Sequence, residues 1–262
     1  MKQRKDILVI DDEPMVTRAV AKICSAEGMT VSVAAHASEA LQNLVDHEFR
    51  LILCDIMMPE LNGFQFLEAL AHQGISTPVV MMTGYSTVEN AVRSLTSPGG
   101  VDYIPKPFTA DELLTIVRRN LHCNELLHQA DSARLQGLGS LTYVPCPTNY
   151  YRLGNVSWAL MDDKGTAMVG VSDLFLKSTK GITSFELSPP GEDLLQGIPC
   201  AEAISPDGSV HNVMCPLSGR ILEVNTRAQT NPSLVEKDPY FRGWLYRIVP
   251  SNPASDLQWL SL

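Results

Sequence analysis

The chain has 262 residues, enough for one large or two ordinary domains, and its composition (45% hydrophobic, 19% charged) is that of a globular protein. No apolar run approaches the length needed to cross a bilayer, and the short run at residues 7–10 ends at acidic residues, so we expect a cytoplasmic protein without a signal peptide. A net charge of −9 and the lack of a basic recognition helix disfavour DNA binding.

The first half, residues 1–122, alternates short apolar runs with segments whose apolar residues recur at helical spacing. This alternation predicts a parallel sheet with helices on both faces. Five strands in about 120 residues are typical of a flavodoxin-like doubly wound α/β sheet. The predicted strands are residues 7–10, 30–34, 51–54, 79–82 and 101–104, and the predicted helices are residues 15–26, 37–46, 63–71, 86–95 and 110–122.

Polar side chains stand where the predicted strands end: Asp11 and Asp12 after the first, Asp55 after the third, Thr83 after the fourth and Lys106 after the fifth. A lone Asp after a strand is more often a turn residue. The carboxyl ends of parallel strands, however, share one crevice. Clustered carboxylates need a cation, and short oxygen ligands suit Mg²⁺. Mg²⁺ with a carboxylate nucleophile, a lysine and a hydroxyl favours phosphoryl transfer onto an aspartate.

These residues resemble the receiver domain of bacterial two-component response regulators. The matching segments, in order and at the family's spacing, are residues 9–14, 55–63, 82–85 and 102–108. Four such motifs in sequence are highly specific. The resemblance implies phosphorelay signal transduction with a sensor histidine kinase as partner.

The resemblance assigns the central role to Asp55, the phosphoacceptor. It implies that Asp11, Asp12, Asp55 and the backbone carbonyl of Met57 hold Mg²⁺. It also implies that the side chains of Met57 and Tyr85 line the approach of water to the acyl phosphate, and so influence the lifetime of the phosphorylated form.

Three further roles follow from the same resemblance. Thr83 hydrogen-bonds the phosphoryl group, and Lys106 pairs with its oxygens. Tyr103 is the switch residue, which turns inward when Thr83 moves. The bond between Lys106 and Pro107 is a candidate cis peptide, as a bond preceding proline allows.

A helical linker is predicted for residues 123–141, between a receiver domain at 1–122 and a second domain at 142–262. The helical pattern continues past residue 122 and is expected to stop at Gly137 and Gly139. Apolar heptad positions are not sustained, so a solvated connecting helix is favoured over a dimeric coiled coil. The oligomeric state stays open.

The second half changes to short apolar segments separated by Gly, Pro, Asp and Ser. This pattern predicts a β-rich barrel or sandwich with few helices. Its predicted strands are residues 166–171, 182–187, 199–204, 210–214, 219–224 and 244–248, and short helices are predicted at 173–177 and 231–235.

This half resembles the glycine cleavage system H protein, a lipoyl-domain relative, through residues 168–173, 185–192, 215–225, 231–235 and 238–245. That family carries a lipoyl group on a lysine at a hairpin tip. Here Gly208 stands at the expected position, and no lysine lies between Lys180 and Lys237. We therefore expect no lipoate, and we predict that Asp207 and Gly208 form a two-residue hairpin turn.

From these observations we expect a response regulator with a non-lipoylated, H-protein-like interaction domain. The partner of this domain is unidentified, and we expect no separate enzymatic output. The alternatives are a phosphorylation-independent scaffold, an accessory protein of glycine-cleavage or lipoate metabolism, and a redox sensor using Cys200 and Cys215. Six scattered cysteines without a C-x-x-C pair favour free thiols over a metal cluster. His211 has no evident catalytic partner and is expected to be a surface or a hydrogen-bonded structural histidine.

Overall fold

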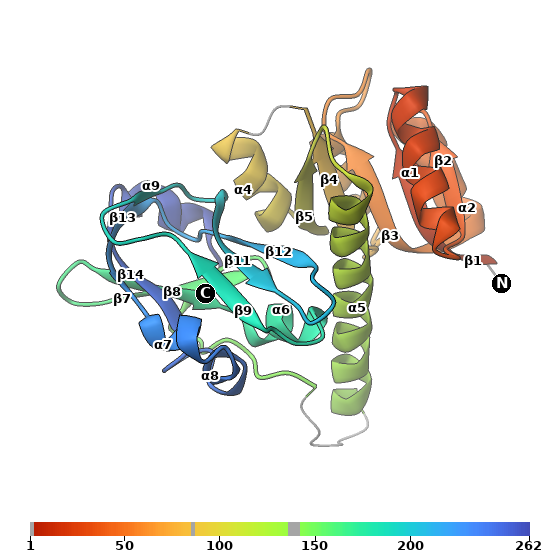
Figure 1. The fold of residues 1–262 in the computed structure, drawn as a ribbon. Helices are drawn as coiled ribbons and strands as arrows, with labels where there is room; N and C mark the ends of the chain where they lie inside the picture. Colours follow the sequence, from red (N-terminus) through yellow and green to blue (C-terminus); the bar gives the residue numbers. More distant parts are fainter. Residues whose placement is uncertain (1–2, 85–86, 136–141) are drawn as a thin grey trace. The chain divides into compact units, whose positions relative to one another are not determined.

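The structure, a computed structural model, describes residues 3–84, 87–135 and 142–262 (Figure 1). The chain divides into two compact units, Met1–Asn124 and Glu125–Leu262. Among the described residues, no helix combines the length and the apolar character needed to cross a membrane.

The first unit is built on a five-stranded parallel sheet with strand order β2-β1-β3-β4-β5. This confirms the predicted flavodoxin-like sheet. Its middle strands are apolar on both faces because helices cover both, and Leu51–Asp55 is buried without a break. The strands are β1 (Gln3–Ile10), β2 (Val31–Ala34), β3 (His47–Asp55), β4 (Val79–Thr83) and β5 (Gly100–Pro105).

Four helices connect these strands, α1 (Pro14–Ala26), α2 (Ala37–Asp46), α3 (Gly63–His72) and α4 (Val88–Thr96), and α5 (Ala110–Leu135) follows β5. The start of α3 is fixed by a capping box, in which Asn62 Oδ1 accepts from the Gln65 amide and Gln65 Oε1 accepts from the Asn62 amide. Helix α5 continues past residue 122 as far as Leu135. The predicted stop at Gly137 and Gly139 lies outside the described residues.

Strands β1 and β3 are longer than their apolar runs predict. Polar residues at their amino ends pair in parallel register, with Gln3 opposite His47 and Arg4 opposite Glu48. The Arg50 guanidinium lies 2.9 Å from the Asp6 carboxylate, an ion pair between the two strands. Backbone pairing does not require apolar side chains, so the apolar pattern locates only the buried part of each strand.

The second unit is β-rich, as predicted, and its strands are antiparallel. One sheet has the order β10-β13-β14-β8-β7-β6, and a smaller sheet has the order β12-β11-β9. The strands are β6 (Tyr151–Leu153), β7 (Ser157–Met161), β8 (Ala167–Val171), β9 (Ser184–Leu187), β10 (Asp193–Leu194), β11 (Pro199–Ile204), β12 (Val210–Met214), β13 (Gly219–Val224) and β14 (Trp244–Pro250).

An aromatic cluster of Tyr150, Trp158 and Tyr240 forms part of the core of this unit. Trp158 is fully buried, and its indole N–H donates to the Val171 carbonyl at 3.0 Å. A Cβ on Gly170 would lie 2.3 Å from the Trp158 ring, so only glycine fits beneath it. Short helices complete the unit: α6 (Asp173–Ser178), α7 (Thr226–Thr230), α8 (Ser233–Lys237), α9 (Pro253–Asp256) and the 3-10 turn η1 (Leu257–Trp259).

The hairpin between β11 and β12 corrects one prediction. Asp207 and Gly208 do not form a two-residue turn. The loop is Pro206-Asp207-Gly208, closed by Ser205, whose amide donates to the Ser209 carbonyl at 3.0 Å and whose carbonyl accepts from the Gly208 amide at 2.9 Å. Gly208 has φ +83°, so the loop is a β-turn followed by a left-handed residue. Proline is favoured at the second position of such a turn, where Pro206 lies. The prediction of a two-residue turn did not take Pro206 into account.

Candidate functional site

Three aspartates meet at the carboxyl end of the five-stranded parallel sheet. Strands β1 and β3 are parallel neighbours with Ile10 opposite Cys54, which sets Asp11 beside Asp55. One carboxylate oxygen from each of Asp11, Asp12 and Asp55 lies within 4.8 Å of the other two. Asp11 and Asp55 are buried and Asp12 is exposed. The predicted acidic residues therefore share one site with an open side.

Lys106, at the end of β5, places its ammonium group between two of these carboxylates. Lys106 Nζ lies 2.6 Å from Asp11 Oδ2 and 2.8 Å from Asp55 Oδ1, with Glu13 Oε1 farther away at 3.6 Å. Burial by itself lowers the pKa of Lys106, but its hydrogen bonds to Asp11 and Asp55 outweigh burial and raise the pKa above 10.5. The lysine is therefore a fixed positive charge in the site.

The surroundings of Asp11 change the pKa of its carboxyl group. Burial raises the pKa of Asp11 above 3.8, and this effect exceeds the lowering by the hydrogen bonds from Lys106 and the Glu13 amide. Apart from its contact with Lys106, Asp11 Oδ2 has no hydrogen-bond partner among the described residues. A buried carboxylate with unused acceptor capacity beside two other carboxylates suits a hard cation such as Mg²⁺.

Thr83 and Tyr103 lie on the neighbouring strands β4 and β5. Thr83 ends β4 and is buried, and its carbonyl accepts from the Lys106 amide at 2.7 Å. The peptide bond between Lys106 and Pro107 is cis, which confirms that prediction. The Tyr103 side chain is 4% exposed, and burial raises its pKa to about 12. The Tyr103 side chain is thus turned inward, away from solvent.

The segment that follows Asp55 packs closely against the carboxylate and the backbone carbonyl of Asp55. The Met57 amide donates to Asp55 Oδ2 at 3.0 Å, and the Met57 side chain is 61% exposed. A Cβ on Gly63 would lie 2.5 Å from the Asp55 carbonyl oxygen and 2.6 Å from the Met81 methyl carbon. Glycine is therefore needed at the start of α3. Tyr85, the other residue expected near the water's approach, lies outside the described residues.

Sequence reasoning missed a buried ion pair next to Tyr103. Asp102, on β5, is fully buried and pairs with Arg119 of α5. Asn120 Nδ2 donates to the same Asp102 oxygen at 2.9 Å, and the Tyr103 amide donates to the other oxygen at 2.9 Å. A charged residue inside an apolar strand, with a basic residue on the following helix, is the signal that points to such a pair.

In the second unit, Gly208 lies at the exposed tip of the β11–β12 hairpin. The neighbouring His211 is buried, and its Nε2 lies 3.2 Å from the Ser205 hydroxyl. That hydroxyl donates to Asp207 Oδ1 at 2.6 Å, so these residues brace the loop. The expectation of a hydrogen-bonded structural histidine is confirmed.

The thiols of Cys200 and Cys215 meet in space, as the redox alternative requires. Both residues are buried. The hydrogen bond with Cys215 and burial together raise the pKa of Cys200 well above its usual value. Thiols react as thiolates, so this environment opposes oxidation.

Comparison with known proteins yields two family matches: the response regulator receiver domain over residues 7–118 and the glycine cleavage H-protein over residues 149–261. Regulatory protein AtoC of Escherichia coli is 37% identical over 145 residues, covering 53% of this chain and 31% of that protein. Nitrogen assimilation regulatory protein NtrX of Azorhizobium caulinodans is 36% identical over 118 residues, 44% of this chain and 26% of that protein. The chain thus spans about a third or less of these two relatives' length.

Two solved structures are similar to separate halves of the chain. The receiver domain of NtrX from Brucella abortus is 38% identical, with 44% of this chain and 98% of that one covered and a TM-score of 0.42. A glycine cleavage system H protein from Mycobacterium marinum is 28% identical, with 40% of this chain and 86% of that one covered and a TM-score of 0.38.

The parallel sheet with an acidic cluster at its edge is the architecture of a CheY-like receiver. The first half of the chain is thus similar to response regulator receiver domains, and the second half to glycine cleavage H-proteins.

Proposed function

We propose that this protein is a two-component response regulator in which a sensor histidine kinase phosphorylates Asp55. The observation that carries the proposal is the position of the Lys106 ammonium group between the carboxylates of Asp11 and Asp55. A carboxylate nucleophile flanked by a fixed cation can accept a phosphoryl group whose negative charge the cation offsets.

Asp11, Asp12, Asp55 and the Met57 carbonyl would hold Mg²⁺, which when bound neutralises charge on the phosphoryl oxygens. In the transfer, an Asp55 oxygen forms the new O–P bond while the P–N bond of the kinase phosphohistidine breaks. The imidazole keeps the electron pair and takes a proton from solvent. Lys106 pairs with the incoming oxygens, and the Thr83 hydroxyl donates to one of them.

Phosphorylation then shifts a population between two arrangements of Thr83 and Tyr103. Tyr103 is buried in the described structure, so the proposed switch requires a second state in which its ring is exposed. The receiver sequence and site support this account more strongly than a scaffold that never takes phosphate, because all five polar positions are present.

For the second unit, we propose a protein-interaction module that carries no lipoyl group. An amide to lipoate needs a side-chain amine, and the hairpin tip has Gly208 at that position. The match to the H-protein family supports a second candidate, an enzyme-linked carrier in glycine or lipoate metabolism. Intact mass spectrometry separates the two, because a carrier would show a lipoyl adduct.

The test of phosphorylation is intact mass after incubation with acetyl phosphate and Mg²⁺. The wild type is expected to gain one phosphoryl group, and Asp55→Asn none. Asp46→Asn, at an exposed aspartate of the same unit, is the matched control and should behave as the wild type. Equal phosphorylation of the Asp55→Asn variant would refute the assignment of the phosphoacceptor.

A further inference from the structure

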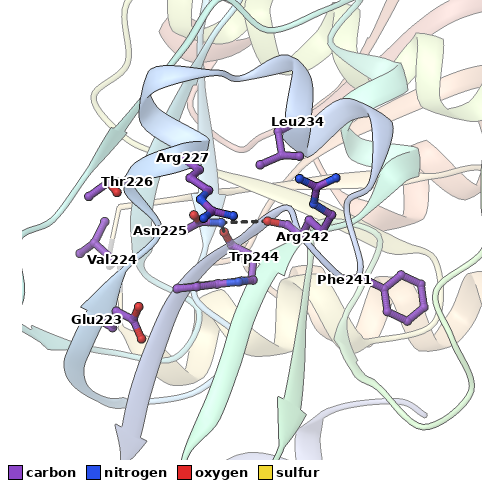
Figure 2. Close-up of a pocket in the computed structure, with 9 residues that line it drawn as sticks. All are labelled: Glu223, Val224, Asn225, Thr226, Arg227, Leu234, Phe241, Arg242 and Trp244. Carbon is purple, nitrogen blue, oxygen red and sulfur yellow. Dashed lines mark hydrogen bonds between the residues drawn. The ribbon is translucent and has the colours of Figure 1, made fainter.

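A pocket of about 310 Å³ lies in the second unit. Its lining residues all come from the segment 223–244, which follows the hairpin that carries Gly208 in the sequence. Its wall comes from the end of β13, from α7 and from the loop that precedes β14 (Figure 2). Residues that define it include Glu223, Asn225, Arg227, Arg242 and Trp244. We call it the Arg227/Arg242 pocket.

Two arginines give the pocket its charge. Arg227, from α7, and Arg242, from the loop before β14, are both drawn at the pocket in Figure 2. Neither guanidinium makes an ion pair with any residue that the structure describes. Glu223, the acid in the wall, lies 3.9 Å from Arg247 instead. Two cations that share a small hollow repel each other, and an anion bound between them would relieve that repulsion.

The wall of the pocket is held in place by Asn225, which is buried. Its side-chain amide donates to the Arg242 carbonyl at 2.9 Å and to the Trp244 carbonyl at 2.7 Å. Its backbone amide donates to the Leu245 carbonyl at 2.9 Å. One side chain therefore fixes the backbone that carries both Arg242 and Trp244. A site fixed before its ligand arrives loses less entropy on binding.

Trp244 adds a flat apolar surface beside the charges. The residue is half-buried and packs against the aromatic cluster of Tyr150, Trp158 and Tyr240. Its ring is therefore anchored on the core side. A planar group can pack on an indole, and arginine offers paired N–H donors that match carboxylate and phosphate oxygens.

We propose that the Arg227/Arg242 pocket binds a small organic anion, whose phosphate or carboxylate oxygens pair with Arg227 and Arg242 and whose planar or apolar portion packs against Trp244. The pocket volume is at the lower end of the roughly 300–1,000 Å³ typical of ligand sites, which fits a ligand with one ring and one acidic group. The second unit would then be a ligand-sensing module. The inference does not depend on phosphorylation of Asp55.

The test uses the full chain and three ligands that share a phenyl ring: phenyl phosphate, benzoate and neutral benzyl alcohol. The signal is the indole N–H resonance of Trp244 in ¹H–¹⁵N spectra, assigned with Trp244→Phe. At least one of the two anions is expected to shift it saturably at millimolar concentration, and benzyl alcohol to leave it unchanged. Binding of phenyl phosphate alone identifies a phosphate ligand, and binding of benzoate alone a carboxylate ligand.

The variants Arg227→Gln and Arg242→Gln are each expected to weaken anion binding about tenfold, since a charge-assisted hydrogen bond is lost. Arg220→Gln, at an exposed arginine of the same unit that lies outside the pocket wall, is the matched control and should bind as the wild type. An unchanged Trp158 indole resonance shows that each variant is folded. Absence of a saturable shift with both anions, or equal weakening by Arg220→Gln, would overturn the proposal.

Discussion

Lys106 Nζ lies 2.8 Å from Asp55 Oδ1 at the carboxyl edge of the receiver sheet. The same ammonium group lies 2.6 Å from Asp11 Oδ2, so it separates two buried carboxylates. Lys106 therefore affects both the stability of the fold and the reactivity of Asp55, because removing its ammonium group leaves both acids without their nearest positive charge.

Replacing Lys106 with methionine is expected to slow phosphorylation of Asp55 by acetyl phosphate about a hundredfold, the usual cost of losing one preorganised donor. The variant should also be stabilised more than the wild type by added Mg²⁺, because the ion takes over the charge neutralisation. Phosphorylation rates by mass spectrometry and urea midpoints with and without Mg²⁺ check both parts. Lys22→Met, at an exposed lysine of α1, is the control. A variant phosphorylated at the wild-type rate would contradict the role of Lys106.

Replacing Gly63 with alanine is expected to destabilise the protein by about 1–3 kcal/mol, as overpacking does. The new Cβ would lie 2.5 Å from the Asp55 carbonyl oxygen. Chemical denaturation measures the loss. At Gly84 a Cβ has nothing within 4 Å, so Gly84→Ala is the matched control. Equal stability of the two variants would show that the backbone at Asp55 can move away without cost.

The two neighbouring arginines of α5 are expected to differ in their contribution to stability. Arg119 pairs with the fully buried Asp102, and Asp102→Ala should destabilise by about 3–5 kcal/mol because a buried charge loses its partner. Arg118 pairs with Glu27 at the surface, and Arg118→Gln should cost about 1 kcal/mol or less. Urea unfolding of both variants tests the contrast. The double variant Asp102→Ala with Arg119→Met should recover part of the loss.

The hairpin that carries Gly208 is expected to lose stability in acid through Asp207. Hydrogen bonds from the Ser205 hydroxyl and the Ser209 amide lower the pKa of Asp207 from 3.8 to about 2. A carboxyl with a lowered folded-state pKa stabilises the fold above its unfolded pKa, and the contribution disappears as the pH falls toward about 2. A carboxyl ¹³C titration of Asp207 measures this directly. A midpoint near 3.8, or a midpoint unchanged by Ser205→Ala, would contradict it.

The buried thiols are expected to resist oxidation. The hydrogen bond with Cys215 and burial raise the pKa of Cys200, which leaves little thiolate at neutral pH. Oxidised glutathione should therefore form no disulfide between Cys200 and Cys215 in the folded protein, while the unfolded chain reacts. Peptide mapping of the folded and the unfolded protein after this treatment shows whether the disulfide has formed. Rapid disulfide formation in the folded state would restore the redox sensor as a leading alternative.

The sequence located the receiver site well because its chemistry lies at strand ends. Apolar runs place those ends, and Asp11, Asp55 and Lys106 follow directly. The polar starts of β1 and β3 escaped detection because backbone pairing needs no apolar residue. The Arg227/Arg242 pocket escaped for a different reason: its arginines come from a short helix and a loop, where no periodicity marks a face. Asn225, which fixes that loop, can be recognised only from its hydrogen bonds.

At the hairpin tip, Gly208 has φ +83° and exposed surroundings. A lysine substituted there would sit in a backbone region that side chains other than glycine, asparagine and aspartate rarely adopt. A lysine at position 208, the side chain that a lipoyl amide needs, would therefore add about 1–2 kcal/mol of backbone strain to the loop from Pro206 to Gly208.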